Sequence, residues 1–269
     1  MLLSALRFEY IDQTAASSGD GSPRRSVFCL SETEGSAVTD TSSPLVVCTE
    51  VTRRYDSDGG PFTADGRTVT ALDSVSLDVA GGEVVGVAGP SGSGKSTLLH
   101  LLAGLDTPTT GAIEVCGTTI GALSRRQRTT FRRENVGMVF QRFHLLPALT
   151  ARENVALPLV QAGIARSDRQ SRADELLDAV GLDDRPSHYP SALSGGEQQR
   201  VAIARALAAD PAVVIADEPT GELDRETGKR VLDLLTDVSD GRAIIVASHD
   251  EYTLDRTDRV VRLRDGARQ

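Results

Sequence analysis

The sequence predicts an α/β fold built around a parallel β-sheet. Residues 83–88, 212–216 and 243–247 are short runs of mainly Val, Ile and Ala, typical of strands that are buried on both faces. Longer segments with helical character follow these runs. Strands that alternate with helices indicate a parallel sheet.

The N-terminal segment differs from the rest of the chain. Residues 14–44 are rich in Ser, Thr, Gly and Asp and show little apolar periodicity. Such a segment buries too little surface to offset its ordering entropy. We therefore predict that residues 1–44 form a disordered extension, or reflect an overlong choice of start codon, and that residues 45–269 form the ordered domain. Residues 1–10 lack a long apolar core, so no secretory signal is expected.

The first elements of the ordered domain are predicted from alternation. Residues 45–51 and 69–79 alternate in the manner of β-strands, and the polar, glycine-rich residues 56–67 form a loop between them. A helix is expected from residue 95 to about 103, because Gly104 is a plausible helix stop.

The second half of the domain is more helical. Three pairs of residues have capping-box spacing before an amphipathic run: Thr150 with Glu153, Ser167 with Gln170, and Ser194 with Glu197. A further helix is expected over 225–238. The last strand is expected over 259–264, and the few residues after it leave no room for a regulatory domain.

Composition narrows the class of protein. Of the 269 residues, 39% are hydrophobic and 25% are charged, which is ordinary for a globular chain. No run approaches the roughly 18 apolar residues that span a bilayer. The formal charge of −9 argues against broad nucleic-acid binding. The cysteines Cys29, Cys48 and Cys116 form no C-x-x-C pair, which suits a reducing compartment such as the cytoplasm.

A phosphate-binding loop follows the strand predicted at 83–88. The pattern Gly89-x-x-x-x-Gly94-Lys95-Ser96 lies between that strand and the helix predicted at 95–103, the context that this motif requires. Backbone N–H groups of such a loop bind phosphate oxygens, the lysine reaches the β and γ phosphates, and the serine hydroxyl is placed to bind Mg²⁺. We therefore expect ATP and Mg²⁺ as ligands, bound by the loop residues Gly89, Pro90, Ser91, Gly92, Ser93, Gly94, Lys95, Ser96 and Thr97.

Two carboxylates end the strand predicted at 212–216. Acidic groups at the end of a buried strand are costly without a cation or donors. We expect Asp217 to hold Mg²⁺ and Glu218 to polarise the water that attacks the γ-phosphate. A phosphate loop beside these carboxylates in one sheet favours this interpretation over a solvated strand end.

The segment Leu193-Ser-Gly-Gly-Glu-Gln-Gln-Arg200 makes the prediction more specific. It resembles the signature of ATP-binding cassette (ABC) transporter ATPases, and the resemblance covers residues 45–266. It implies a P-loop core with a parallel sheet, an antiparallel β subdomain and a helical subdomain, here at about 142–210. It also implies a head-to-tail dimer, in which Ser194, Gly195 and Gly196 of one protomer close on ATP held by the other.

Other family positions match in order. The resemblance implies that Tyr55 stacks on adenine, that Gln141 binds Mg²⁺ and senses a membrane partner, and that Asp224 lies in a loop facing the second protomer. It further implies that His249 contacts the γ-phosphate. Glu222 departs from the family pattern, in which small or amide residues are commoner.

Local matches around residues 133–155 and 188–194 resemble the lipoprotein-releasing and macrolide-exporter class. This resemblance implies a separately encoded permease and a location at the cytoplasmic face of the membrane, reached through that permease. Two other functions stay open: an ATPase that regulates a membrane signalling or cell-division partner, and a nucleic-acid-associated cassette. The acidic balance and the single cassette disfavour the second.

Overall fold

The computed structural model of the chain describes residues 44–56 and 68–269. The predicted extension at 1–44 therefore lies outside the described residues, except for Pro44, which begins the first strand. Most of the predicted loop at 56–67 lies outside them as well.

The parallel sheet predicted from the sequence is present. Its order is β10-β9-β3-β8-β7-β6, and all neighbours are parallel except the terminal hairpin of β9 and β10. The strands are β3 (Val84–Ala88), β6 (Val136–Val139), β7 (Val213–Asp217), β8 (Ala243–Ser248), β9 (Arg259–Arg264) and β10 (Ala267–Arg268).

A second, antiparallel sheet has the order β2-β1-β4-β5. It comprises β1 (Pro44–Asp56), β2 (Thr68–Ala80), β4 (Thr110–Val115) and β5 (Thr118–Thr119). The alternation at 45–51 and 69–79 thus predicts real strands, which are longer than expected. Strands β4, β5 and β6 were not predicted individually.

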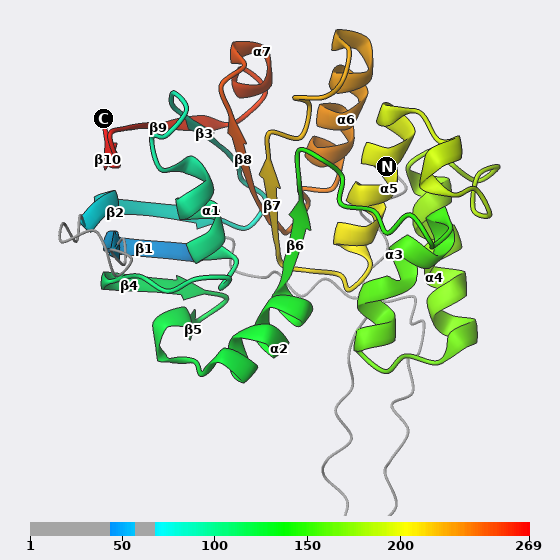
Figure 1. The fold of residues 1–269 in the computed structure, drawn as a ribbon, viewed down its shortest axis with the longest axis horizontal. Helices are drawn as coiled ribbons and strands as arrows, with labels where there is room; N and C mark the ends of the chain where they lie inside the picture. Colours follow the sequence, from blue (N-terminus) through cyan, green and yellow to red (C-terminus); the bar gives the residue numbers. More distant parts are fainter. Residues whose placement is uncertain (1–43, 57–67) are drawn as a thin grey trace, which may run out of the picture.

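Helix α1 (Lys95–Leu102) lies between the two sheets (Figure 1). Leu98, Leu99, Leu101 and Leu102 are fully buried in a core shared by the antiparallel sheet and one face of the parallel sheet. Gly104, at φ 64°, follows the helix as predicted. The phosphate-loop helix is therefore held on both sides by packed apolar surface.

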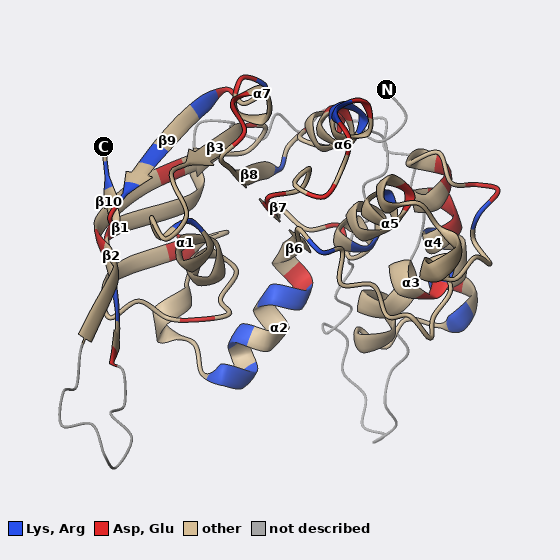
Figure 2. Cartoon of the chain, turned by 45° about the horizontal axis from the view of Figure 1, so that its top comes forward, with Lys and Arg blue, Asp and Glu red and all other residues tan. Residues whose placement is uncertain are grey.

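A second core covers the other face of the parallel sheet. It contains α3 (Ala151–Gln161), α4 (Arg166–Ala179), α5 (Gly195–Leu207) and α6 (Arg225–Asp237), which lie on the right of Figure 1. Helix α2 (Arg125–Asn135), the short helix α7 (Glu251–Leu254) and 3₁₀ turns at Ile120–Ala122 and Pro190–Ala192 are the other helical elements of the described residues. Much of the α2 ribbon is blue in Figure 2, because arginine is the commonest residue of this helix.

Two of the three predicted capping boxes are present. Thr150 and Ser194 accept hydrogen bonds from the backbone N–H groups of Glu153 and Glu197, which reciprocate. The prediction at Ser167 is wrong. Helix α4 starts earlier, with Ala165 as its cap, and the Ser167 hydroxyl donates to Asp168 instead.

The early start of α4 has a local cause. Gly163, at φ 78°, reverses the chain after α3, and the N–H of Ile164 donates to Leu159 while its side chain packs on the second core. The turn leaves no residues for a cap at Ser167.

Within the described ranges, every helix is too short or too polar to cross a bilayer.

Candidate functional site

The phosphate loop joins the end of β3 to the start of α1. Gly94, at φ 101°, is the helix cap, and a Cβ there would lie 2.5 Å from the Ala71 carbonyl oxygen. A Cβ on Gly89 would lie 2.5 Å from the Ser93 hydroxyl oxygen. Only glycine fits the backbone at Gly94, because a side chain would meet both a disfavoured φ and β2.

The polar groups of this loop suit phosphate. Lys95 is 8% exposed, and its ammonium donates to the carbonyls of Gly89 at 2.7 Å and Pro90 at 3.2 Å. The Ser93 hydroxyl is buried and has no hydrogen-bond partner among the described residues. Pro90, Ser91, Gly92 and Ser96 are exposed, and Thr97 is half-buried. A buried cation and an unpaired hydroxyl in a glycine-shaped cradle fit the phosphates of a nucleotide.

The predicted catalytic residues meet at the same edge of the sheet. In the parallel register, Asp217 pairs with Ala247 and Ser248 pairs with Ala88. Glu218, His249 and the phosphate loop therefore follow directly from neighbouring strand ends. Carboxyl ends of parallel strands are where open α/β sheets bind ligands.

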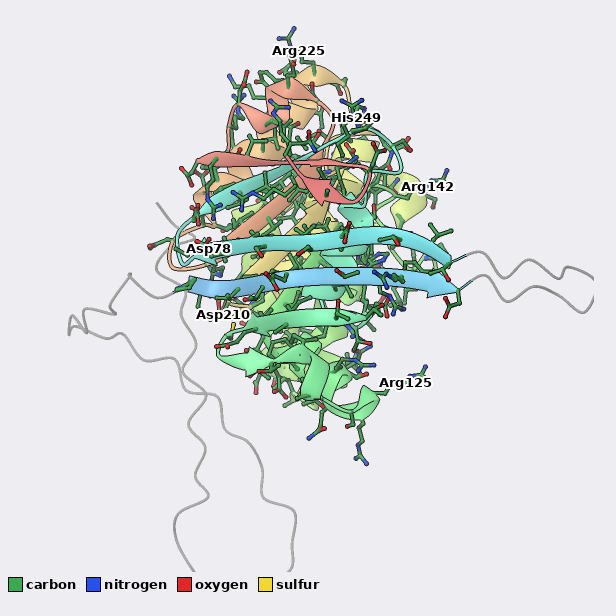
Figure 3. All side chains as sticks on the ribbon, turned by 90° about the vertical axis from the view of Figure 1, so that its left-hand side faces the viewer. Asp78, Arg125, Arg142, Asp210, Arg225 and His249 are labelled. Atoms are coloured by element: carbon green, nitrogen blue, oxygen red, sulfur yellow. The ribbon has the colours of Figure 1, made fainter. Side chains whose placement is uncertain are left out.

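Glu218 and His249 are joined by a hydrogen bond. The His249 Nδ1 atom lies 2.9 Å from Glu218 Oε1, and the Ser248 hydroxyl donates to Glu218 Oε2 at 3.3 Å. An ionised carboxylate only accepts, so Nδ1 is the donor of this hydrogen bond, and Nε2 is the ring nitrogen that does not face Glu218. The Glu218 side chain is 15% exposed and that of His249 is 72% exposed. Figure 3 shows His249 near the upper end of the molecule.

The backbone also sets the direction of the Glu218 carboxylate. The backbone φ of Glu218 is 47°, which is uncommon for a residue other than glycine. The Glu218 N–H donates to the Ala247 carbonyl at 2.9 Å. The Glu218 carboxylate meets Ser248, the last residue of β8, and His249, which follows it.

Gln141 follows β6 at the same edge of the sheet. It is exposed, and its amide nitrogen lies 3.2 Å from the position of a Cβ on Gly221. With the Ser96 hydroxyl and the half-buried Asp217 carboxylate, Gln141 offers the oxygen donors that Mg²⁺ prefers. The described part of the chain holds no cluster of three His, Cys, Asp or Glu side chains suited to a metal. A magnesium site here would accordingly combine one carboxylate with a hydroxyl, an amide and phosphate oxygens.

Tyr55 lies near the end of β1 and is 38% exposed. Its hydroxyl donates to Asp106 Oδ2 at 2.9 Å, and the Arg53 guanidinium donates to the same oxygen at 2.9 Å. The guanidinium carbon of Arg53 lies 4.4 Å from the Tyr55 ring centre. These contacts fix the ring, and neither Arg53 nor Asp106 belongs to a motif that would have revealed them in the sequence.

The remaining predicted residues lie at the starts of α5 and α6. Ser194 caps α5, and its N–H donates to Glu197, which lowers the pKa of that carboxyl. Asp224 caps α6, and the Thr227 hydroxyl donates to it at 2.6 Å, which lowers the pKa of Asp224.

The two helix starts are in contact. A Cβ on Gly196 would lie 2.2 Å from Thr227 Cγ2, and Ser194, Gly196 and Thr227 line one pocket. These residues and the phosphate loop do not form one cluster. In Figures 1 and 2, β7 and β6 separate α1 from α5.

One buried side chain joins α5 to the sheet edge that carries Glu218. Gln199 is fully buried, and its amide donates to the Pro219 carbonyl at 2.6 Å, directly after Glu218. Gln199 carries no signal of this role in the sequence, because its partner is a main-chain carbonyl.

Comparison with known proteins supplies the family. A family model described as "ABC transporter" matches residues 72–221, more than half of the chain. An ABC transporter ATP-binding protein of Thermotoga maritima is 49% identical over 199 residues, which cover 74% of this chain and 85% of that protein. The macrolide export ATP-binding/permease protein MacB of Burkholderia pseudomallei is 45% identical over 226 residues, which cover 84% of this chain and 34% of MacB. The chain thus spans about a third of the length of these MacB relatives.

Solved structures agree. The dimeric structure of a post-hydrolysis state of the ATP-binding cassette MJ0796, bound to ADP and Pi, has a TM-score of 0.75 and 39% sequence identity. The similarity covers 83% of this chain and 96% of that cassette. The motifs, the sheet edge at which they meet and these similarities lead to one conclusion: the chain belongs to the ABC transporter family, as one of its ATP-hydrolysing ATP-binding cassettes.

Proposed function

We propose that this cassette works as an ATP-dependent homodimer that drives a separately encoded membrane permease of the export or lipoprotein-release type. The observation that carries the proposal is the division of the motifs within one chain. The phosphate loop, Glu218 and His249 meet at one sheet edge, whereas Ser194 lies beyond β6 and β7 at the start of α5. A second copy, placed head to tail, would bring its Ser194, Gly195 and Gly196 to that edge.

Each residue of the site has a proposed task. Tyr55 stacks on adenine, and Lys95 and the loop N–H groups bind the phosphates. Ser96, Gln141 and Asp217 would hold Mg²⁺, which neutralises phosphate charge when it is bound. Asp224 lies at the boundary with the second protomer.

In the hydrolytic step, water attacks the γ-phosphorus as the bond to the β-phosphate oxygen breaks, which yields ADP and phosphate. Glu218 accepts the proton of the attacking water, and His249 contacts the γ-phosphate with the side of its ring that does not face Glu218. The hydrogen bond between Glu218 and His249 holds the base beside the side chain that contacts the γ-phosphate.

Substitution of the base tests the catalytic assignment. Glu218→Gln keeps the shape of the side chain but removes its basicity, so this variant should bind ATP and hydrolyse it at least about 100-fold more slowly. An ATP-stabilised dimer should then accumulate, and light scattering would detect its mass. Turnover at the wild-type rate would refute the role of Glu218.

The partner is tested by isolating the intact complex from membranes. We expect a permease with a large extracytoplasmic domain to co-purify with the chain, as the resemblance to the lipoprotein-releasing and macrolide-exporter class implies. A partner with a signalling or cell-division domain would favour the regulatory function instead. ATPase activity stimulated by nucleic acid would favour the nucleic-acid function.

A further inference from the structure

The residues directly after Gln141 have an unusual backbone. Phe143 and His144 have φ values of 53° and 49°, and neither is glycine. Each such residue costs about 1–3 kcal/mol and persists only where the surroundings enforce it. We call residues 141–144 the Gln141 loop.

Arg205 of α5 holds this loop. Its Nη1 donates to the His144 carbonyl at 2.6 Å, and its Nη2 donates to the Phe143 carbonyl at 2.7 Å. The two ends of one guanidinium thus grip the carbonyls of the two residues with positive φ. A planar fork of this kind fixes direction as well as distance.

These two carbonyls are the acceptors that the structure gives for the Arg205 guanidinium. Burial lowers the pKa of the guanidinium, and no carboxylate among the described residues pairs with it. A partly buried cation without a counter-ion is costly unless its donors are satisfied. If the loop rearranged, Arg205 would lose both acceptors.

The same loop touches two other motifs. The Phe143 ring lies 3.8 Å from the position of a Cβ on Gly195, at the start of α5. The Gln141 amide lies against Gly221, which precedes Asp224. The Gln141 loop therefore contacts both segments that the proposed dimer would present to the second nucleotide.

We propose that Arg205 is a positioning residue that latches the Gln141 loop to α5. The Gln141 amide oxygen and residues 194–196, which we call the Ser194 segment, would then move as one unit. The latch rests on the proposed role of Gln141 as a donor to the metal–nucleotide complex. It supplies a mechanical path from the loop that is expected to sense the permease to the segment that closes on ATP.

Nucleotide binding by the full chain tests the latch without relying on turnover. The probe is a fluorescent, non-hydrolysable ATP analogue, titrated in EDTA and across a series of Mg²⁺ concentrations. R205M keeps an unbranched apolar stem in place of the arginine stem and removes the charge and the donors. We expect its affinity in EDTA to stay within about twofold of wild type, and the enhancement by Mg²⁺ to fall by about fivefold or more.

Three variants make the result specific. Q141A removes the donor itself and should lose the same enhancement. R205K keeps the charge but not the fork, so it should restore part of the enhancement. R169M is the matched control, because Arg169 also donates to a main-chain carbonyl, that of Ile164, but far from the Gln141 loop. It should bind as wild type does.

The outcomes separate the two hypotheses. Unchanged binding in Q141A would remove Gln141 from the site and count against the proposed function. A loss in Q141A with full Mg²⁺ enhancement in R205M would overturn the latch. An equal loss of R205M affinity in EDTA and in Mg²⁺ would make Arg205 a merely structural residue. If R205M does not fold, R205K decides in the same way, because full enhancement in that variant would overturn the latch.

Discussion

At the scale of single residues, the phosphate loop is shaped by steric limits as much as by chemistry. Gly94 combines a φ of 101° with a Cβ position 2.5 Å from the Ala71 carbonyl oxygen. The phosphate loop therefore packs closely against β2 through the protein's own backbone. Glycine is required there by the protein itself.

Alanine substitutions at two glycines separate the cost in unfolding free energy of a positive φ from the cost of a steric clash. Gly117, at φ 71°, has open space around its Cβ position, so G117A should cost only about 1 kcal/mol of unfolding free energy. G94A adds a clash with backbone and should cost about 3 kcal/mol or more and weaken nucleotide binding. Urea unfolding measures both. Equal costs would show that β2 yields to the new methyl group.

The Tyr55 ring is positioned by Asp106, which accepts hydrogen bonds from both Tyr55 and Arg53. D106A should release the ring and weaken ATP binding by about three- to tenfold, because each lost hydrogen bond is worth about 1 kcal/mol. In a double-mutant cycle with Y55A, the two effects should not add, because Asp106 acts through the ring. Additive losses in fluorescence titrations would contradict this.

At the scale of elements, an ion pair joins the starts of β3 and β9. The Arg259 guanidinium donates to Glu83 at 2.5 Å and also to the Asp78 carbonyl in β2. The hydrogen bond from Arg259 lowers the pKa of Glu83 below its ordinary 4.5. One arginine therefore links three strands from both sheets.

This pair predicts a pH dependence of stability. A carboxyl with a lowered pKa stabilises the fold above its ordinary pKa, and this contribution is lost as the pH falls through the lowered value. E83Q should therefore melt below wild type at pH 7, at a cost of about 1 kcal/mol, and the difference should close as the pH falls from 4.5 through the lowered pKa of Glu83. Calorimetry across pH 3–7 measures it. A difference that persists in acid would assign the effect to packing.

The elements that sequence analysis predicted are those with strong local signals. The buried strands β3, β7 and β8 are apolar throughout, and the caps of α3 and α5 satisfy both halves of their boxes. Capping-box spacing at Ser167 failed because the turn at Gly163 had already fixed the start of α4. Spacing identifies candidates for a cap, but chain reversal decides among them.

Motif residues of the site were predicted, and their supporting partners were not. Lys95 and Glu218 follow from residue type and spacing, and His249 follows from the family resemblance. Arg205 and Gln199 donate to main-chain carbonyls, and Asp106 contacts residues about 50 positions away. Such contacts depend on the folded chain and leave no pattern in the sequence.

At the scale of the whole molecule, the proposed dimer makes a prediction about mixed subunits. K95A disables the phosphate loop, and S194R blocks the Ser194 segment. Each homodimer should be inactive, because both of its sites are damaged. A mixture should regain part of the activity, because one site in each mixed dimer combines an intact loop with an intact Ser194 segment.

Phosphate release from the separate and mixed proteins measures this complementation. Wild-type protein diluted with inactive K95A/S194R is the control for subunit exchange. A mixture of K95A and S194R that stays as inactive as its components would mean that each chain completes its own site.

The distribution of primary amines has a practical consequence. The sequence contains only two lysines, of which Lys95 is 8% exposed and hydrogen-bonded, whereas Lys229 is exposed on α6. Of the two lysines, Lys229 should therefore be the main site of attachment for an amine-reactive dye. Acylation of Lys95, followed by mass spectrometry, would then report directly on opening of the phosphate loop, against a background of one side chain.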